Sequence, residues 1–343
     1  MAFFTVFTIW VSAVRSSHLR INALMSGGAR QTSAVTYWVR RAFNSLLVVW
    51  GVASLVFFAL RLAPGDPVES ILGEQALDVD KQKLRECLDL HLSLPEQYGR
   101  FMIEVTTGTF GELCEQKNVT VRDKLVENIP STVELAFAGM LMAILISLPL
   151  GIVSALKRGT WVDNVAAFVS LLGLSMPNFW LGPMLLILFS VTLRLLPDPG
   201  SGIEGVTGLI LPAITLGTAL AAKLTRMTRT SVLDVLNQDF IRTARAKGLA
   251  ERVVVGKHVL RNALIPVTTI AGLQLGALLT GAIIVEKVFA RPGVGSLLLQ
   301  AIEMRNYRIV QGCVLFIALT YVLVNILTDI LYTFIDPRVS LNK

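Results

Sequence analysis

Residues Thr132–Ala155 read TVELAFAGMLMAILISLPLGIVSA, and Glu134 is the only ionisable residue among them. A helix of ~20 apolar residues crosses the ~30 Å hydrocarbon core of a bilayer. Backbone groups in that core must bond within the chain, which leaves helices or a closed barrel. The run is much longer than a barrel strand of ~10 residues. We therefore expect a membrane-spanning helix here.

Similar apolar runs lie on both sides of this one. Together they predict an all-α, polytopic membrane protein with six spans, at about 42–60, 132–155, 162–193, 209–226, 268–288 and 309–334. The third run has about 32 residues, or roughly 48 Å as a helix, and contains Pro177. Because its front half alone is too short to span, we expect one tilted helix that is kinked at this proline.

The composition agrees with a membrane protein. Of the 343 residues, 53% are hydrophobic and 16% are charged, which is too little charge for the surface of a soluble domain. The net charge of +7 is explained by basic cytoplasmic loops, and no aromatic-rich basic stripe indicates nucleic acid.

The distribution of charge predicts the orientation. Residues 1–41 contain five arginines and no acidic residue, and residues 223–261 contain nine basic residues against three acidic ones. Lys and Arg are enriched in loops that stay in the cytoplasm. With six spans these segments share one side, so we expect both termini inside and the acidic loop 63–131 outside. Residues 1–39 are expected to be a cytoplasmic tail of unknown structure.

The outer loop carries two of the three cysteines, Cys87 and Cys114. They can form a disulfide in an oxidising compartment or remain two free thiols, and the sequence favours neither. A helix is expected within the loop at Asp78–Leu92. Cys313 lies in an apolar run as a packing residue. No CxxC or Cys/His metal spacing occurs, so we expect no metal or cofactor.

The polar segment 234–266 separates two spans. Asp239 is a candidate helix N-cap, and Gly248 is a candidate left-handed residue that ends the helix. A second helical stretch is expected at Ala250–Leu264, with Pro266 in the first turn of the next span. From these residues alone, a basic amphipathic helix lying on anionic lipid is an equally good interpretation.

The order of residues in this segment carries a resemblance. Arg242-Thr-Ala-Arg-Ala-Lys-Gly-Leu249 resembles the coupling motif, or EAA loop, of ABC-importer permeases in its dipeptide/oligopeptide/nickel form. Arg242, Thr243 and Ala244 occupy the positions of the general Glu-Ala-Ala, so that only Ala244 and Gly248 match the general form, as is usual in the peptide branch. Lys257-His258 and Leu260–Pro266 continue the match. The resemblance runs from Arg40 to Arg338, with further matching stretches at Leu62–Pro67, Pro130–Leu135, Ser175–Leu181, Leu279–Phe289, Arg291–Gly295 and Asp336–Arg338.

The resemblance implies a type I ABC-importer permease domain at 40–343, in a bacterial inner membrane, that moves peptides inward. It implies four partners: a second similar permease, two ATP-binding subunits and an extracytoplasmic solute-binding protein. The coupling residues would dock in a groove on an ATPase, with Ala244 and Ala246 allowing close approach and Arg245 and Lys247 pairing with its acidic groups. These residues are Arg242, Thr243, Ala244, Arg245, Ala246, Lys247, Gly248 and Leu249. Nickel or another small solute is the alternative cargo.

The sequence argues against an enzyme. The phosphate-binding pattern GxxxxGK[ST] is absent, so ATP must be hydrolysed by a partner. Gly173-Leu-Ser175-Met-Pro177 only approaches the GxSxG of serine hydrolases, and all three histidines lie outside the expected spans. A self-contained secondary transporter is the other alternative, but the repeats and midplane charges of that class are not found.

Polar residues at membrane depth are candidates for the transport path. They are Ser175, Asn178, Gln274 and Thr280. Inter-helix hydrogen bonds are an equally good explanation for them. Glu286, near the outer end of the fifth span, is a candidate external gate. The alternative is an interfacial carboxylate that pairs with Lys287 or Arg291.

Overall fold

The structure, a computed structural model, describes residues 34–62, 66–73, 75–114, 119–198 and 205–335. Its contacts define two compact units, Met1–Leu46 with Asp336–Lys343, and Leu47–Ile335. Of the first unit, only the start of helix α2 is described. Most of the tail expected at 1–39 and the Asp336–Arg338 motif therefore lie outside the described residues.

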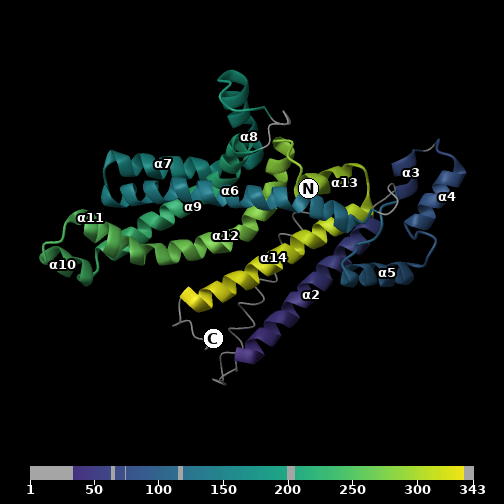
Figure 1. The fold of residues 1–343 in the computed structure, drawn as a ribbon, viewed down its shortest axis with the longest axis horizontal. Coiled ribbons are helices and arrows are strands. Elements are labelled where there is room, and N and C mark those ends of the chain that lie inside the picture. The colour runs from purple at the N-terminus through teal and green to yellow at the C-terminus, as the bar shows by residue number, and fades with distance from the viewer. Residues whose placement is uncertain (1–33, 63–65, 74, 115–118, 199–204, 336–343) are drawn as a thin grey trace. The chain divides into compact units, whose positions relative to one another are not determined.

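Helices make up nearly all the regular structure of the described residues (Figure 1). Five helical runs are long and apolar enough to cross a membrane, and a bent pair makes a sixth if it counts as one span. The five runs lie in α2 (Ala34–Arg61), α6 (Val121–Leu156), α9 (Val206–Leu236), the continuous run that ends with α12 (Leu260–Val288), and α14 (Tyr307–Ile335). The predicted all-α, polytopic fold class is confirmed.

Several helices extend beyond their apolar runs. Helix α6 begins at Val121 rather than Thr132, because its first turns are polar and precede the apolar run. Its N-terminus is closed by a capping box, in which Thr120 Oγ1 accepts from the Asp123 N–H and the Asp123 carboxylate accepts from the Thr120 N–H. Hydropathy alone cannot find such extensions, because it detects only the apolar part.

The third span is not one kinked helix, and that prediction is wrong. Helix α7 (Trp161–Ser175) and the pair α8 (Asn178–Leu186) with η1 (Ile187–Thr192) meet at an angle of 107°. Proline disfavours a helical conformation in the residue before it, and Met176 accordingly has ψ 118°. The break at Met176 and Pro177 is therefore complete.

Pro266 does not begin a helix. Short helix α11 (Glu251–Val253), the wide π-helical segment η2 (Val254–Val259) and α12 form one run of 38 residues, with Pro266 in its interior. The second helical stretch and the fifth span, which we expected to be separate elements, are thus continuous. A single interior proline removes one backbone hydrogen bond, and packing against neighbouring helices offsets this cost.

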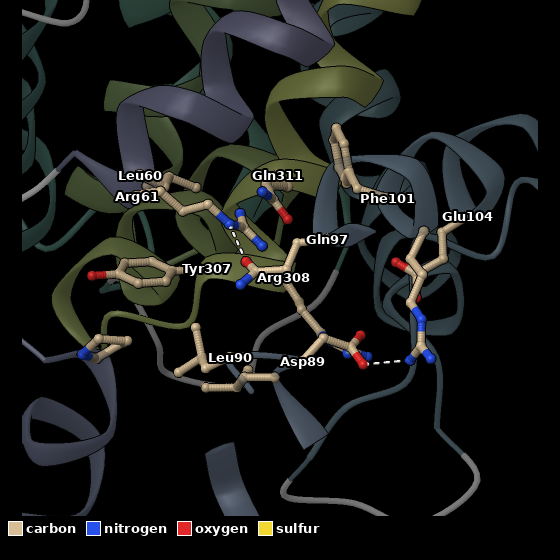
Figure 2. A pocket seen from close by; sticks show the side chains of 13 residues that line it. Leu60, Arg61, Asp89, Leu90, Gln97, Phe101, Glu104, Tyr307, Arg308 and Gln311 are labelled. Atoms are coloured by element: carbon tan, nitrogen blue, oxygen red, sulfur yellow. Dashed lines mark hydrogen bonds and ion pairs between the residues drawn. The ribbon is translucent and has the colours of Figure 1, made fainter. Parts of the chain in front are cut away.

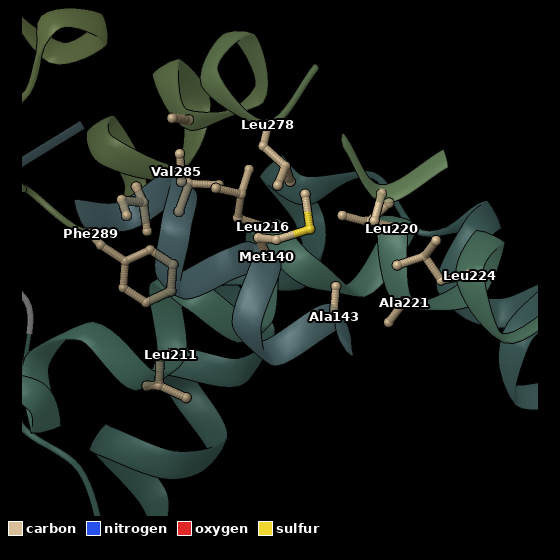
Figure 3. Close-up of a cluster of buried hydrophobic side chains, with 14 of the residues drawn as sticks. Met140, Ala143, Leu211, Leu216, Leu220, Ala221, Leu224, Leu278, Val285 and Phe289 are labelled. Atoms are coloured by element: carbon tan, nitrogen blue, oxygen red, sulfur yellow. The ribbon is translucent and has the colours of Figure 1, made fainter. Parts of the chain in front are cut away.

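Helices α6, α9 and α12 share the main apolar core (Figure 3). Leu135 and Met140 of α6 meet Leu216 and Leu224 of α9, and Leu278 of α12 joins the same cluster. The α6 and α9 backbones approach closely, because a Cβ at Gly217 would lie 2.5 Å from the carbonyl oxygen of Gly139. Small residues at such crossings are typical of packed membrane helices.

The predicted outer loop is largely helical. It contains α3 (Pro67–Leu72), α4 (Asp78–Cys87) and α5 (Leu94–Thr107), and a further helix, α13 (Val294–Glu303), lies between α12 and α14. The helix expected at Asp78–Leu92 is confirmed as α4, although it ends at Cys87. Phe101 of α5 packs with Phe57 of α2 and Leu315 of α14, which attaches this layer to the spans.

Candidate functional site

Helix α10 (Asp239–Ala246) forms the centre of the predicted coupling segment. Gln238, not Asp239, is its N-cap, and no side chain caps its first turn. Asp239 is instead the first helical residue and lies 3.6 Å from Arg242 in an exposed ion pair. The predicted Asp239 cap is therefore wrong. At the other end Gly248 has φ +75°, which confirms the predicted left-handed residue.

The two faces of α10 have different neighbours. Ile241 and Ala244, three residues apart on one face, are buried at 0% and 7% exposure. They pack in one cluster with Ala155 of α6, Val232 of α9 and Val259 of η2. Ala244 is thus used inside the chain and is not available to an ATPase. The outward face carries Arg242, Thr243, Arg245, Ala246 and Lys247.

An ion pair closes the turn after α10. Arg245 donates to both carboxylate oxygens of Glu251, at 2.6 and 3.2 Å, across the bend at Gly248. The hydrogen bonds from Arg245 to Glu251 raise the pKa of the guanidinium. The structure therefore gives Arg245 a partner within the chain, whereas the sequence led us to expect one on another subunit. The turn brings these residues together, which a helix-spacing rule does not reveal.

Three large apolar side chains are exposed around the same segment. Phe240 and Leu249 are 40% exposed, and Val253 is 42% exposed. Phe240 and Val253 were missed by the sequence interpretation, which followed the motif residues only. Their exposure beside Ala246 indicates an apolar surface that another protein can cover.

A buried ion pair links the helices near α10. The Asp163 carboxylate at the start of α7 accepts from Arg229 of α9 at 2.7 and 2.8 Å. It also accepts from Ser154 of α6 at 2.6 Å and from the Gly159 N–H at 3.0 Å. The contact joins the ends of three helices. Sequence reasoning counted Arg229 only as a basic loop residue.

The far end of α12 holds a second buried carboxylate. Glu286 is 0% exposed, and its Oε1 accepts from Thr132 Oγ1 of α6 at 2.6 Å. Its Oε2 accepts from the N–H groups of Gly295 and Ser296 at 2.8 and 3.0 Å. These N–H groups lie in the first turn of α13, where helix donors lack partners within the helix. Glu286 thus anchors the start of α13 to α6 and α12.

The alternative pairing expected for Glu286 is wrong. Arg291 is bound to Glu134 at 2.9 Å, and Lys287 lies 3.1 Å from Glu303. Successive residues of a helix point in different directions, so Lys287 cannot share the inward direction of Glu286. Glu286 is buried rather than interfacial.

The four path candidates are not brought into one cluster. Asn178, at the start of α8, lies beside α12, because a Cβ at Gly281 would be 3.9 Å from its Nδ2. Thr280 is next to Gly281 in the chain, but its hydroxyl donates to the Gly276 carbonyl of its own helix at 3.1 Å. Ser175 is exposed at the end of α7, and Gln274 is half-buried on α12.

Cys87 and Cys114 are bonded in the structure, with their Cα atoms 5.9 Å apart. Of the two states left open by the sequence, the structure therefore has the disulfide. The bond connects Cys87, the last residue of α4, to the segment that precedes α6. Cys313 is buried as a free thiol. Among the described residues, no group of three or more His, Cys, Asp or Glu side chains is placed to hold a metal ion.

These features define a class of protein. Several apolar spans, with a short helix that is anchored on one face and exposed on the other between two of them, have the organisation of a transporter's membrane subunit. The chain offers no ATP-binding motif of its own.

Comparison with known proteins identifies the family. The chain belongs to the binding-protein-dependent transport system inner membrane components, whose family model matches residues 147–341. It is 39% identical to a dipeptide transport system permease protein, DppB, of Alkalihalophilus pseudofirmus, covering 89% of this chain and 99% of that one. It is 40% identical to the glutathione transport system permease protein GsiC of Pectobacterium atrosepticum, with coverage of 89% and 99%.

A third relative is the di/tripeptide transport system permease protein DppB of Pseudomonas aeruginosa, which is 40% identical with coverage of 89% and 98%. A solved structure of the MetNI methionine ABC transporter, in an inward-facing conformation, has the same fold. It aligns with a TM-score of 0.51 at 18% identity, over 62% of this chain and 96% of that one. The chain is a multi-pass inner-membrane permease subunit of an ABC importer. Permeases of this family work with ATP-binding and substrate-binding proteins.

Proposed function

We propose that this permease subunit conducts small peptides inward, driven by ATP that partner subunits hydrolyse. The cargo is inferred from the relatives, whose names specify dipeptides, di/tripeptides and glutathione. The observation that carries the mechanism is the two-faced helix α10. Its inner face is packed on three long helices, and its outer face is free for a motor subunit.

Transmission depends on the packing under α10. Ile241 and Ala244 contact α6, α9 and the π-helical start of the α12 run, so these helices share one buried cluster. Dense cores move as units rather than deform continuously. A displacement of α10 by a docked ATPase would therefore move the ends of all three helices together. The Asp163–Arg229 pair extends the same connection to α7.

The docking face is a revised set of residues. It consists of Arg242, Thr243, Ala246 and Lys247, joined by the apolar side chains of Phe240, Leu249 and Val253. Exposed ion pairs contribute only ~0.2–1 kcal/mol each, so shape and apolar contact should dominate. Arg245 acts within the chain, where it fixes the turn at Gly248 against Glu251.

The orientation and assembly follow from charge and family. We propose that the basic segment 223–261 and both termini lie in the cytoplasm and the layer α3–α5 outside, which the excess of Lys and Arg in that segment supports. The complete importer would contain a second similar permease, two ATP-binding subunits and an extracytoplasmic solute-binding protein. Residues 1–39 precede a permease domain at 40–343, and no nucleic acid takes part.

The path is proposed to run beside the break in the third span. Asn178 lies there against Gly281 of α12, with Thr280 adjacent, and Ser175 and Gln274 are the further candidates. Broken helices at membrane depth are tolerated where they are buried in protein or line a water-filled cavity. Glu286 is proposed to hold the outer gate in shape from a buried position, through the start of α13.

Reconstitution tests this function. Vesicles that contain the complete importer should accumulate a labelled dipeptide when ATP is supplied to the ATPase side. Gly248→Pro should abolish uptake but leave membrane insertion intact, because φ +75° is inaccessible to proline. Gly248→Asn is the matched control, since asparagine tolerates the left-handed conformation, and it should retain uptake. Uptake by the Gly248→Pro variant at the wild-type rate would refute the coupling role.

A further inference from the structure

A polar cavity of about 110 Å³ lies in the outer layer (Figure 2). It is enclosed by the end of α2, the turn after α4, helix α5 and the start of α14. The charged and amide side chains on its wall are Arg61, Asp89, Gln97, Arg100, Glu104, Arg308 and Gln311. The function proposed above makes no use of this cavity.

Part of the charge in the cavity is neutralised internally. Asp89 lies 2.6 Å from Arg100 and 3.3 Å from Arg308, so both cations share one carboxylate. Arg308 also donates to the backbone carbonyls of Cys87 and Glu112, which fixes it against the disulfide-bonded segment. These groups form a rigid wall whose hydrogen-bonding capacity is largely used.

Two side chains on the same cavity, Arg61 and Gln311, keep hydrogen-bonding capacity for a ligand. The Arg61 Nε donates to Gln97 at 2.6 Å, and the guanidinium lies 3.6 Å from the centre of the Phe57 ring. Among the described residues, no ion pair joins Arg61 to a carboxylate, and the Asp89 carboxylate of the same cavity is bound instead to Arg100 and Arg308. Gln311 is 7% exposed, and its Nε2 has no hydrogen-bond partner among the described residues. A buried donor without a partner costs about 1–3 kcal/mol.

We propose that this cavity is a binding site for one small oxyanion, a carboxylate or a phosphate, held between the Arg61 guanidinium and the Gln311 amide. An oxyanion would supply the acceptor that Gln311 Nε2 lacks and would add one to the guanidinium of Arg61, whose Nε alone is bonded to Gln97. Arginine presents a planar fork that matches these anions. Figure 2 shows both side chains directed into the cavity.

The surroundings suit such a ligand. Three arginines on the cavity wall, Arg61, Arg100 and Arg308, stand against two carboxylates, Asp89 and Glu104, so the charge of the lining is net positive. Arg61 ends one span and Tyr307 begins another, so the cavity is at the level of the lipid headgroups. The anion has two possible sources, therefore: the phosphate of a lipid headgroup, or the free anion of a solute in the outer compartment.

Thermal unfolding of the purified full chain in detergent tests the site. Sodium phosphate and sodium acetate should each raise the unfolding temperature of the wild type above that in sodium chloride of equal ionic strength. Gln311→Glu replaces the donor with a negative acceptor of the same shape and should weaken binding about tenfold or more. Gln300→Glu, an exposed residue of α13 outside the cavity, carries the same charge change and should bind like the wild type.

A second measurement distinguishes the lipid headgroup from the free anion as the source of the ligand. It also keeps the test valid if one variant folds poorly. Native mass spectrometry after reconstitution with phosphatidylglycerol should show more retained lipid on the wild type than on Gln311→Glu or Arg61→Lys if the phosphate comes from a headgroup. Shifts with the free anions, but no difference in retained lipid, would identify a soluble anion. If neither the free anions nor the lipid distinguishes the wild type from both cavity variants, the proposal is overturned.

Discussion

Thr132 Oγ1 donates a 2.6 Å hydrogen bond to the Glu286 carboxylate across 154 residues of chain. The same hydroxyl oxygen accepts a 2.9 Å hydrogen bond from the N–H of Val294. One side chain of α6 therefore holds both the end of α12 and the beginning of α13. This relationship gives a defined geometry to the end of the bundle where α6, α12 and α13 meet.

Removal of the Thr132 hydroxyl should destabilise the protein. Thr132→Val keeps the side-chain shape but leaves Glu286 and Val294 each without one partner, at an expected cost of about 1–3 kcal/mol. Denaturant unfolding of the detergent-solubilised chain measures this cost. Thr280→Val is the control, because that hydroxyl bonds only to its own helix, and it should change stability much less. Equal effects of the two variants would count against the anchor.

The start of α13 should not accept a side chain at Gly295. A Cβ there would lie 2.3 Å from the Ile283 Cα, a backbone atom that cannot move away without shifting α12. Gly295→Ala should therefore reduce stability by about 1–3 kcal/mol or more, as overpacking does. Gly99→Ala, inside α5 with no atom within 4 Å of the new Cβ, should be neutral or stabilising. A neutral Gly295→Ala would disprove the close approach of α12 and α13.

Thiol counting should reveal the disulfide between Cys87 and Cys114. The chain has three cysteines, and the structure bonds Cys87 to Cys114. Alkylation in denaturant, followed by mass measurement, should add one label without reductant and three after reduction. Cys87→Ser frees Cys114 and should give two labels without reductant. Three labels on unreduced wild-type protein from the native membrane would contradict the bond.

Charge exchange should distinguish two roles for Arg245. If its function is to close the turn with Glu251, Arg245→Glu should reduce uptake, and the double variant Arg245→Glu with Glu251→Arg should recover most of it. Each single change should cost stability only ~0.2–1 kcal/mol, because the pair is exposed. Failure of the double variant, with normal insertion and expression, would instead indicate a partner outside the chain.

The sequence predicted the fold class well and the site only in part. Among the described residues, the apolar runs coincide with the five helical runs that are long and apolar enough to cross a membrane and with the bent pair, because hydropathy reports length and composition directly. The break at Pro177 was misjudged, since whether a proline kinks or ends a helix depends on the packing around it. The same limit applies to Pro266, which lies within a continuous helix.

The sequence identified the motif residues of α10, but it did not show which of their side chains face the bundle and which face outward. Ile241 and Ala244 face the bundle because of helical geometry combined with a neighbouring cluster that no local pattern reveals. Long-range contacts, such as Asp163 with Arg229 and Thr132 with Glu286, were also missed. They join residues that only the assembled bundle brings together.

Site-specific photo-crosslinking along α10 in membranes of cells that express the complete importer tests the central claim most directly. Probes at the exposed positions Thr243 and Ala246 should capture an ATP-binding subunit, and a probe at buried Ile241 should capture none. This pattern of crosslinks is expected because one face of α10 packs on the bundle and the other face binds the ATP-binding subunit. Capture of no ATP-binding subunit at the exposed positions, or modification of α10 by a membrane-impermeant reagent from outside the cell, would contradict this account.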